Sequence, residues 1–110
     1  MPELGFDALW YHLTLPKLYL QKHEWYFPGG LLYYSAMPRL METLFIPLIH
    51  FTGSIGPKFV QFAAGLISCL SIYKILKQLT SDKLLPLIGV NLFYATWLVS
   101  WQSSSAYIDL

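Results

Sequence analysis

The chain has 110 residues, enough for one small domain, and 55% of them are hydrophobic while only 12% are charged; the mean hydropathy is +0.48. A soluble domain typically carries about 25% charged residues to cover its surface, so we expect much of this chain to face something other than water. The net charge of +1 argues against a nucleic-acid partner, because phosphate binding needs concentrated Lys and Arg. With Cys69 as the single cysteine, an internal disulfide and a cysteine-built metal site are both excluded.

The segment 7–26 mixes leucines and aromatic residues with charged side chains, which is typical of a helix lying in a membrane interface. Its predicted apolar face consists of Leu9, Trp10, Leu13 and Leu20. Pro16 is expected to interrupt or kink this helix, and the Pro-Gly-Gly sequence at 28–30 predicts a turn.

Residues 38–52 form a second, shorter apolar segment that carries Glu42 and is broken by Pro47. About 15 residues is marginal for a membrane span, so we interpret the segment as interfacial or re-entrant. Arg39 and Glu42 are three residues apart, a spacing that favours a local ion pair on a helix.

Two further uncharged stretches follow, at 59–73 and 84–108. The first extends to 57–79 if Lys74 and Lys77 reach toward one membrane interface, so each is long enough to cross a bilayer as a helix. We predict spans at 57–79 and 84–101, the second ending at Trp97 and Trp101, which suit a membrane interface. The predicted fold is therefore an all-α membrane protein, with interfacial or re-entrant helices followed by two transmembrane helices.

Three of the seven Lys and Arg residues lie within ten positions around the connection between the two spans, namely Lys74, Lys77 and Lys83. Short lysine-rich loops stay on the cytoplasmic side. The predicted organisation is a non-cytoplasmic loop at 1–56, a span at 57–79, a cytoplasmic loop at 80–83, a span at 84–101 and a second non-cytoplasmic loop beginning at 102–110.

This topology places Asp7 and Asp109 on the same side of the membrane, whereas a crossing by residues 38–52 would separate them. Two carboxylates on one face can hold a divalent cation, or can provide one general base beside one metal ligand. The alternative is structural: Asp7 as a helix cap and Asp109 as an ordinary loop residue.

Three stretches, taken in order, resemble GT-C superfamily membrane glycosyltransferases, similar in layout to protein mannosyltransferases and the lipid A aminoarabinose transferase. They are GFDALWYHLTLPKLYL at 5–20, YYSAMPRLMETLFIPLIHFTG at 33–53 and SSSAYIDL at 103–110. The most specific parts are FDALWYHL-x-x-PK and the final AYIDL.

The resemblance implies that Asp7 is the catalytic base near the acceptor and that Asp109 helps bind a divalent metal, Mg²⁺ or Mn²⁺, or orients the lipid donor. It also implies a polyprenyl-phosphate-linked sugar as donor, used on the non-cytoplasmic face of a bacterial inner membrane. His12 and Lys17 are candidate contacts to phosphate or acceptor, or else interfacial side chains. The membrane helices that such enzymes carry before Asp7 and beyond Asp109 are missing, so we expect an N-terminal portion of a polytopic enzyme that is inactive without the remainder.

Two other readings remain open at this point: a non-catalytic polytopic membrane protein, such as a transporter or assembly factor, and a degenerate inactive gene fragment. Transporter sites tend to lie near the bilayer midplane between broken helices. The acidic residues here lie at the ends of the predicted spans, which favours chemistry at the membrane surface.

Overall fold

The computed structural model describes residues 3–37 and 39–107, and every regular element in that part of the chain is a helix, as predicted. The elements are a π-helix η1 (Ala8–His12), α1 (Thr14–Lys22), a 3₁₀-helix η2 (Gly30–Ala36), α2 (Leu40–Thr52), α3 (Ile55–Leu79), α4 (Leu85–Ala95) and α5 (Trp97–Gln102).

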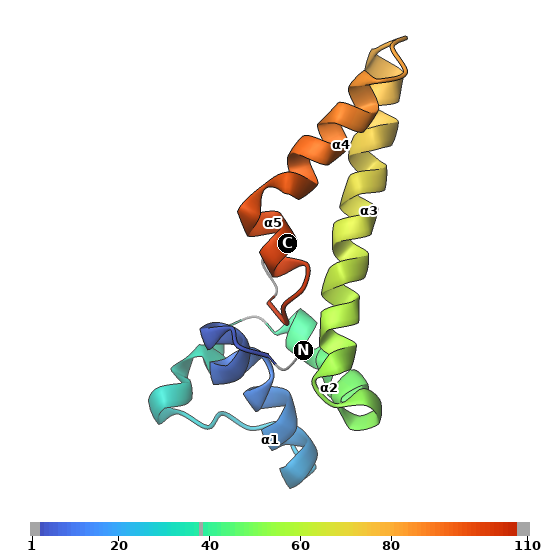
Figure 1. Cartoon of the computed structure of the whole chain (residues 1–110). Coiled ribbons are helices and arrows are strands. Elements are labelled where there is room, and N and C mark those ends of the chain that lie inside the picture. Colours follow the sequence, from blue (N-terminus) through green and yellow to red (C-terminus); the bar gives the residue numbers. More distant parts are fainter. Residues whose placement is uncertain (1–2, 38, 108–110) are drawn as a thin grey trace.

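The molecule is elongated, with principal extents of 55 × 26 × 24 Å, and it divides into two regions (Figure 1). The region that we call the base comprises residues 3–61 and 101–107, apart from Pro38. The region that we call the hairpin comprises residues 62–95, in which α4 turns back along α3 and packs against it. Helix α5 leads from the hairpin back to the base, so residues near both chain ends lie at the same end of the molecule.

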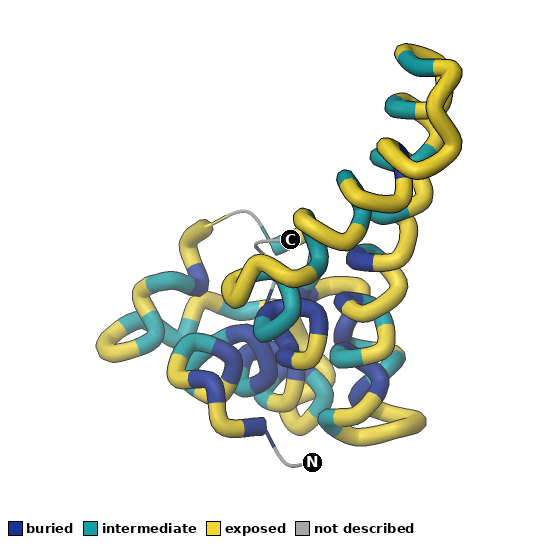
Figure 2. Tube along the Cα trace, turned by 45° about the horizontal axis from the view of Figure 1, so that its top comes forward, coloured by how far each residue is buried: buried dark blue, intermediate teal, exposed yellow. Residues whose placement is uncertain are grey.

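The buried residues of the chain are concentrated in the base (Figure 2). One apolar cluster joins η1, α2 and the segment after α5, and it consists of Ala8, Leu13, Phe45, Ile49, Ala106 and Tyr107. The lack of a side chain at Gly5 allows the Tyr107 ring to lie against the backbone at this position, because a Cβ there would overlap Cε2 of Tyr107. The core therefore depends on contacts between the N-terminal part of the sequence and the segment after α5.

Large apolar side chains are exposed in both regions, but the hairpin has no buried core of its own, because every buried hydrophobic side chain of the described residues lies in the base. The exposed large apolar side chains of the hairpin are Phe62, Leu66, Ile67, Leu70, Ile75, Leu79, Leu84, Leu85, Leu87, Ile88 and Leu92. Helix α4 approaches α3 closely at Gly89, where a Cβ would overlap Cδ1 of Leu76. At the far end, Asp82 closes the turn by accepting a hydrogen bond from the Leu84 amide at 2.7 Å.

The prediction of a long helix at 57–79 is confirmed to within two residues by α3, which has 25 residues. At 1.5 Å per residue it is about 37 Å long. Within the described part of the chain, α3 is the one helix both long and apolar enough to cross a membrane.

The prediction of one continuous helix over 84–101 is wrong, because α4 ends at Ala95 and α5 begins at Trp97. Thr96 between them has an extended backbone, with φ −62° and ψ 123°. Its amide donates to the Phe93 carbonyl at 3.2 Å, while its hydroxyl donates to the Leu92 carbonyl at 3.0 Å. The hydroxyl thus takes the acceptor that the amide would use in a continuous α-helix.

The first predicted helix also differs from the structure. The break falls at Leu13, between η1 and α1, while Pro16 lies in the first turn of α1, where proline is tolerated. The predicted apolar face is split: Leu13 is buried in the core, Leu20 packs against it and Leu9 is exposed. These residues therefore do not form one face of a single interfacial helix.

The predicted turn at 28–30 agrees with the structure: Gly29 and Gly30 have positive φ, and the Leu32 amide donates to the Gly29 carbonyl. The prediction that Pro47 breaks the next helix is wrong, because α2 runs through it as 13 continuous residues. Pro47 and Thr43 are both exposed, so the carbonyl that loses its amide partner to proline belongs to the outer face of the helix.

Candidate functional site

Asp7 immediately precedes η1 and is half-buried, with helical backbone angles of φ −66° and ψ −37°. Its side chain makes no capping hydrogen bond, so the structure gives no support to the alternative of a helix cap. The Asp7 amide donates to the hydroxyl of Tyr107 at 3.4 Å, across 100 residues of sequence. This contact joins the stretch FDALWYHL to the stretch AYIDL.

Helices η1 and η2 together form an aromatic cluster. The Tyr34 ring stacks on Tyr33, with centroids 4.2 Å apart, and meets Trp10 edge-on at 5.0 Å. The pKa of Tyr34 is raised, first by its hydrogen bond with Tyr33, then by burial and by the charge of Tyr33, and least by the charge of Asp7.

His12 is buried, with 1% of its surface exposed, and its Nδ1 lies 2.8 Å from Oε1 of Glu42. The local Arg39–Glu42 ion pair predicted from spacing is wrong, because Glu42 pairs with His12 and Arg39 donates to the Tyr19 hydroxyl. Glu42 points into the core, where the second carboxylate oxygen, Oε2, has no hydrogen-bond partner within the described residues. As a candidate substrate contact, His12 is enclosed in this structure.

The other two predicted site residues are placed differently. Lys17 is exposed on α1, and nothing in the described part of the chain pairs its side chain with Asp7 or His12. Asp109 lies outside the described residues. The described residue nearest to it in sequence is Tyr107, which contacts the Asp7 amide.

Glu3 is the residue that sequence reasoning missed. Its Oε1 accepts hydrogen bonds from the Leu4 and Gly5 amides at 3.0 and 2.9 Å. Its Oε2 accepts one from the Ala106 amide at 2.9 Å and pairs with Nζ of Lys58 at 3.1 Å. The carboxylate thus joins three segments that are far apart in the sequence.

The charge state of Glu3 follows from these partners. Burial by itself would raise its pKa, but the Gly5 and Ala106 amides and the Lys58 ammonium together outweigh burial and lower it. Local sequence offered no indication of this role, because Lys58 and Ala106 are 55 and 103 residues away from Glu3 in the sequence.

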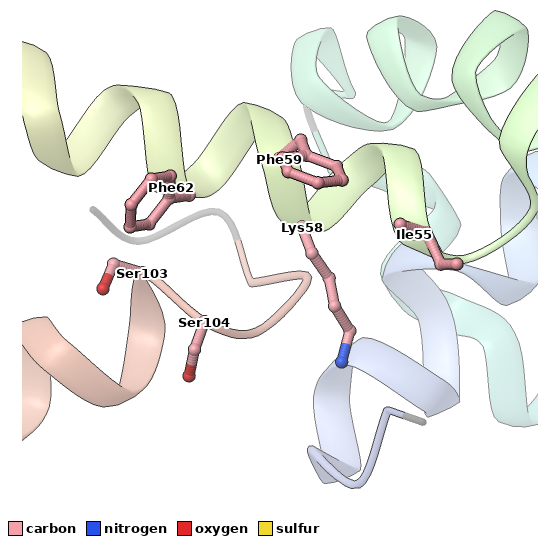
Figure 3. Close-up of a pocket in the computed structure, with 6 residues that line it drawn as sticks. All are labelled: Ile55, Lys58, Phe59, Phe62, Ser103 and Ser104. Carbon is pink, nitrogen blue, oxygen red and sulfur yellow. The ribbon is translucent and has the colours of Figure 1, made fainter. Parts of the chain in front are cut away.

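Two adjoining pockets lie beside this carboxylate, and Lys58 and Ser104 line both of them. The larger, of about 370 Å³, lies between the start of α3 and the turn after α5, and Figure 3 shows Lys58 extending from α3 toward the N-terminal segment. It is lined by Ile55, Lys58, Phe59, Phe62, Ser103 and Ser104. The smaller, of about 260 Å³, is lined by Glu3, Leu4, Gly5, Lys58, Trp101, Ser104 and Ser105. Apolar and polar walls therefore meet where α3 enters the base.

Among residues 3–37 and 39–107, no group of three or more His, Cys, Asp or Glu side chains is arranged to hold a metal ion. The predicted metal ligand, Asp109, is not part of that set. Comparison with family models, curated proteins and solved structures finds no match to this chain. The fold and site define an all-helical protein with one candidate membrane span and a polar, aromatic-lined base at one end of it.

Proposed function

We propose that this chain is part of a polytopic membrane glycosyltransferase of the GT-C kind, which transfers a sugar from a polyprenyl-phosphate-linked donor on the non-cytoplasmic face. One observation carries the proposal: the Asp7 amide meets the Tyr107 hydroxyl at 3.4 Å. Asp7 belongs to FDALWYHL-x-x-PK and Tyr107 to AYIDL, the two stretches most specific to the resemblance, so this contact between opposite ends of the sequence supports a common site.

The hairpin supports a membrane location for that site. Its exposed leucine and isoleucine side chains are unfavourable in water and favourable in hydrocarbon. The connection between α3 and α4 lies at the end of the hairpin that is remote from the base (Figure 1). Lys74 and Lys77 belong to the last turns of α3, and Lys83 belongs to this connection. By the positive-inside rule, the base then faces the non-cytoplasmic side.

In this mechanism the Asp7 carboxylate takes the proton of an acceptor hydroxyl as that oxygen attacks the anomeric carbon of the donor sugar. The bond between that carbon and the lipid phosphate breaks, and its electron pair leaves with the phosphate. A divalent cation, Mg²⁺ or Mn²⁺, held with the help of Asp109 would neutralise charge on the departing phosphate. The exposed ammonium of Lys17 is available to the phosphate or to the acceptor.

The proposal is tested by Asp7→Asn in the full-length gene product, reconstituted in liposomes with radiolabelled polyprenyl-phosphate sugars. Asparagine keeps the size of the side chain but cannot accept the proton, so transfer should fall at least ~100-fold. Asp82→Asn is the matched control, because Asp82 lies in the turn at the far end of the hairpin.

Equal transfer by Asp7→Asn and wild-type protein would remove Asp7 from the mechanism. Absence of transfer from every donor by well-folded wild-type protein would overturn the glycosyltransferase proposal and favour a non-catalytic membrane protein.

A further inference from the structure

The buried pair of His12 and Glu42 has no assigned role in the proposed mechanism. Only 1% of His12 and 4% of Glu42 are exposed, and the carboxylate keeps one oxygen without a partner among the described residues. A buried ion pair is weak as a stabilising device, since well-packed apolar residues of similar volume often replace it at no cost. Stability alone is therefore a poor explanation for this pair.

The geometry of the pair fixes the histidine ring. Nδ1 of His12 lies 2.8 Å from Oε1 of Glu42, and a carboxylate in its ionised form can only accept a hydrogen bond, so in that form Nδ1 is the donor. When the ring is neutral, this leaves Nε2 without a proton. A carboxylate that holds a histidine in this way sets both its tautomer and its orientation.

The pair reaches Asp7 through one intermediate side chain. The rings of His12 and Tyr107 have centroids 6.0 Å apart, and the Tyr107 hydroxyl accepts from the Asp7 amide at 3.4 Å. Asp7 also immediately precedes the π-helix η1 and His12 is its last residue; a π-helix is a form that occurs frequently at functional sites. A single path of contacts thus runs from Glu42 through His12 and Tyr107 to Asp7.

We propose that Glu42 is a positioning residue for the Asp7 site: it orients His12, the His12 ring sets the place of Tyr107, and Tyr107 holds the Asp7 segment. Neither Glu42 nor His12 touches the substrate in this arrangement. The kinetic consequence rests on the proposed glycosyltransferase function, whereas the structural consequence does not.

The first measurement is the histidine tautomer, read from ¹⁵N NMR shifts of histidine-labelled protein in detergent micelles at a pH where the rings are neutral. His23 and His50 are exposed and serve as internal references. We expect His12 in the Nδ1–H form and the references in mixtures. Glu42→Gln should move His12 toward a mixture, while Glu24→Gln, at an exposed site, should leave it unchanged.

The second measurement is the contact between the Tyr107 ring protons and the Asp7 amide proton, read as a nuclear Overhauser effect. Glu42→Gln should weaken it by at least half while the melting temperature stays within a few degrees of wild type. Gly5→Ala should also weaken it, because the new Cβ occupies space held by the Tyr107 ring, yet should leave the His12 tautomer intact. In an active preparation, kcat of Glu42→Gln should fall about 10- to 100-fold with little change in KM.

A wild-type His12 in the same mixture as His23 and His50 would overturn the proposal. So would a Glu42→Gln protein in which the Tyr107–Asp7 contact is unchanged, or one that loses this contact only together with its helical fold. If wild-type protein transfers no sugar, the function proposed above fails, but the two NMR measurements still decide whether Glu42 positions Asp7.

Discussion

The base and the hairpin are built from similar residues but are held together differently. In the base, Phe45 is fully buried, and polar contacts such as that between Glu3 and the Ala106 amide join segments far apart in the sequence. In the hairpin, two apolar helices pack against each other and many of their large apolar side chains are exposed. A buried hydrophobic residue such as Phe45 stabilises a particular packing of the base, whereas an exposed one in the hairpin sets the kind of surroundings that the helices need.

The largest difference should come from removing one phenylalanine ring in each region. Phe45→Ala leaves a cavity in the core of the base and should lower the free energy of unfolding by about 4 kcal/mol. Phe62→Ala, at a side chain that is 43% exposed, should cost less than half as much. Denaturant titrations of both variants in the same detergent measure this, and equal losses would contradict the division into a packed base and an outward-facing hairpin.

A charge placed halfway along α3 tests whether the hairpin lies in a membrane. Ile67 is 63% exposed, so Ile67→Arg would be tolerated in water. In a bilayer centre, arginine disfavours insertion by about 3 kcal/mol. We expect the membrane-bound fraction of the variant to fall clearly, as measured by flotation of membranes.

Thr43→Arg in α2 provides the control for that experiment, because its side chain is exposed in the base. Equal flotation of Ile67→Arg and Thr43→Arg would show that α3 does not cross the membrane.

The smallest expected effect is a dependence of the base on pH through Glu3. The pKa of Glu3 is lower in the folded protein than its ordinary value of 4.5, so the unfolded chain binds a proton more readily. The stabilisation is therefore complete above pH 4.5 and is lost as the pH falls through the lower, folded value. Melting temperatures between pH 7 and 3 should decline less steeply for Glu3→Gln than for wild type; parallel curves would contradict the assignment.

Features that depend on neighbouring residues could be predicted from the sequence, whereas features that depend on contacts between distant residues could not. The helix over α3 was readable because an uncharged stretch is visible in neighbouring residues. The break at Thr96 was missed because threonine is not a helix breaker, and the break depends on where its hydroxyl donates. Pro47 was overestimated, since a helix with an exposed outer face at that point can accommodate it.

The site was predicted in part, for the same reason. Asp7 came from a resemblance to a motif, and its contact with Tyr107 follows only from the fold. Glu42 was assigned to Arg39 on local spacing, but its partner His12 is 30 residues away. Glu3 offered no motif at all, because its partners come from three separate segments. Pairing across such separations is a property of the folded chain that one sequence does not display.

The closure made by Glu3 has a consequence for the order in which the molecule is assembled. The Ala106 amide and the Glu3 carboxylate are 103 residues apart in sequence, so bringing them together closes a loop that contains almost every helix. The entropic cost of closing a loop grows only with the logarithm of its length, but a folding hairpin between the two ends shortens the effective loop greatly. We therefore expect the contact between Glu3 and Ala106 to form after α3 and α4 have paired.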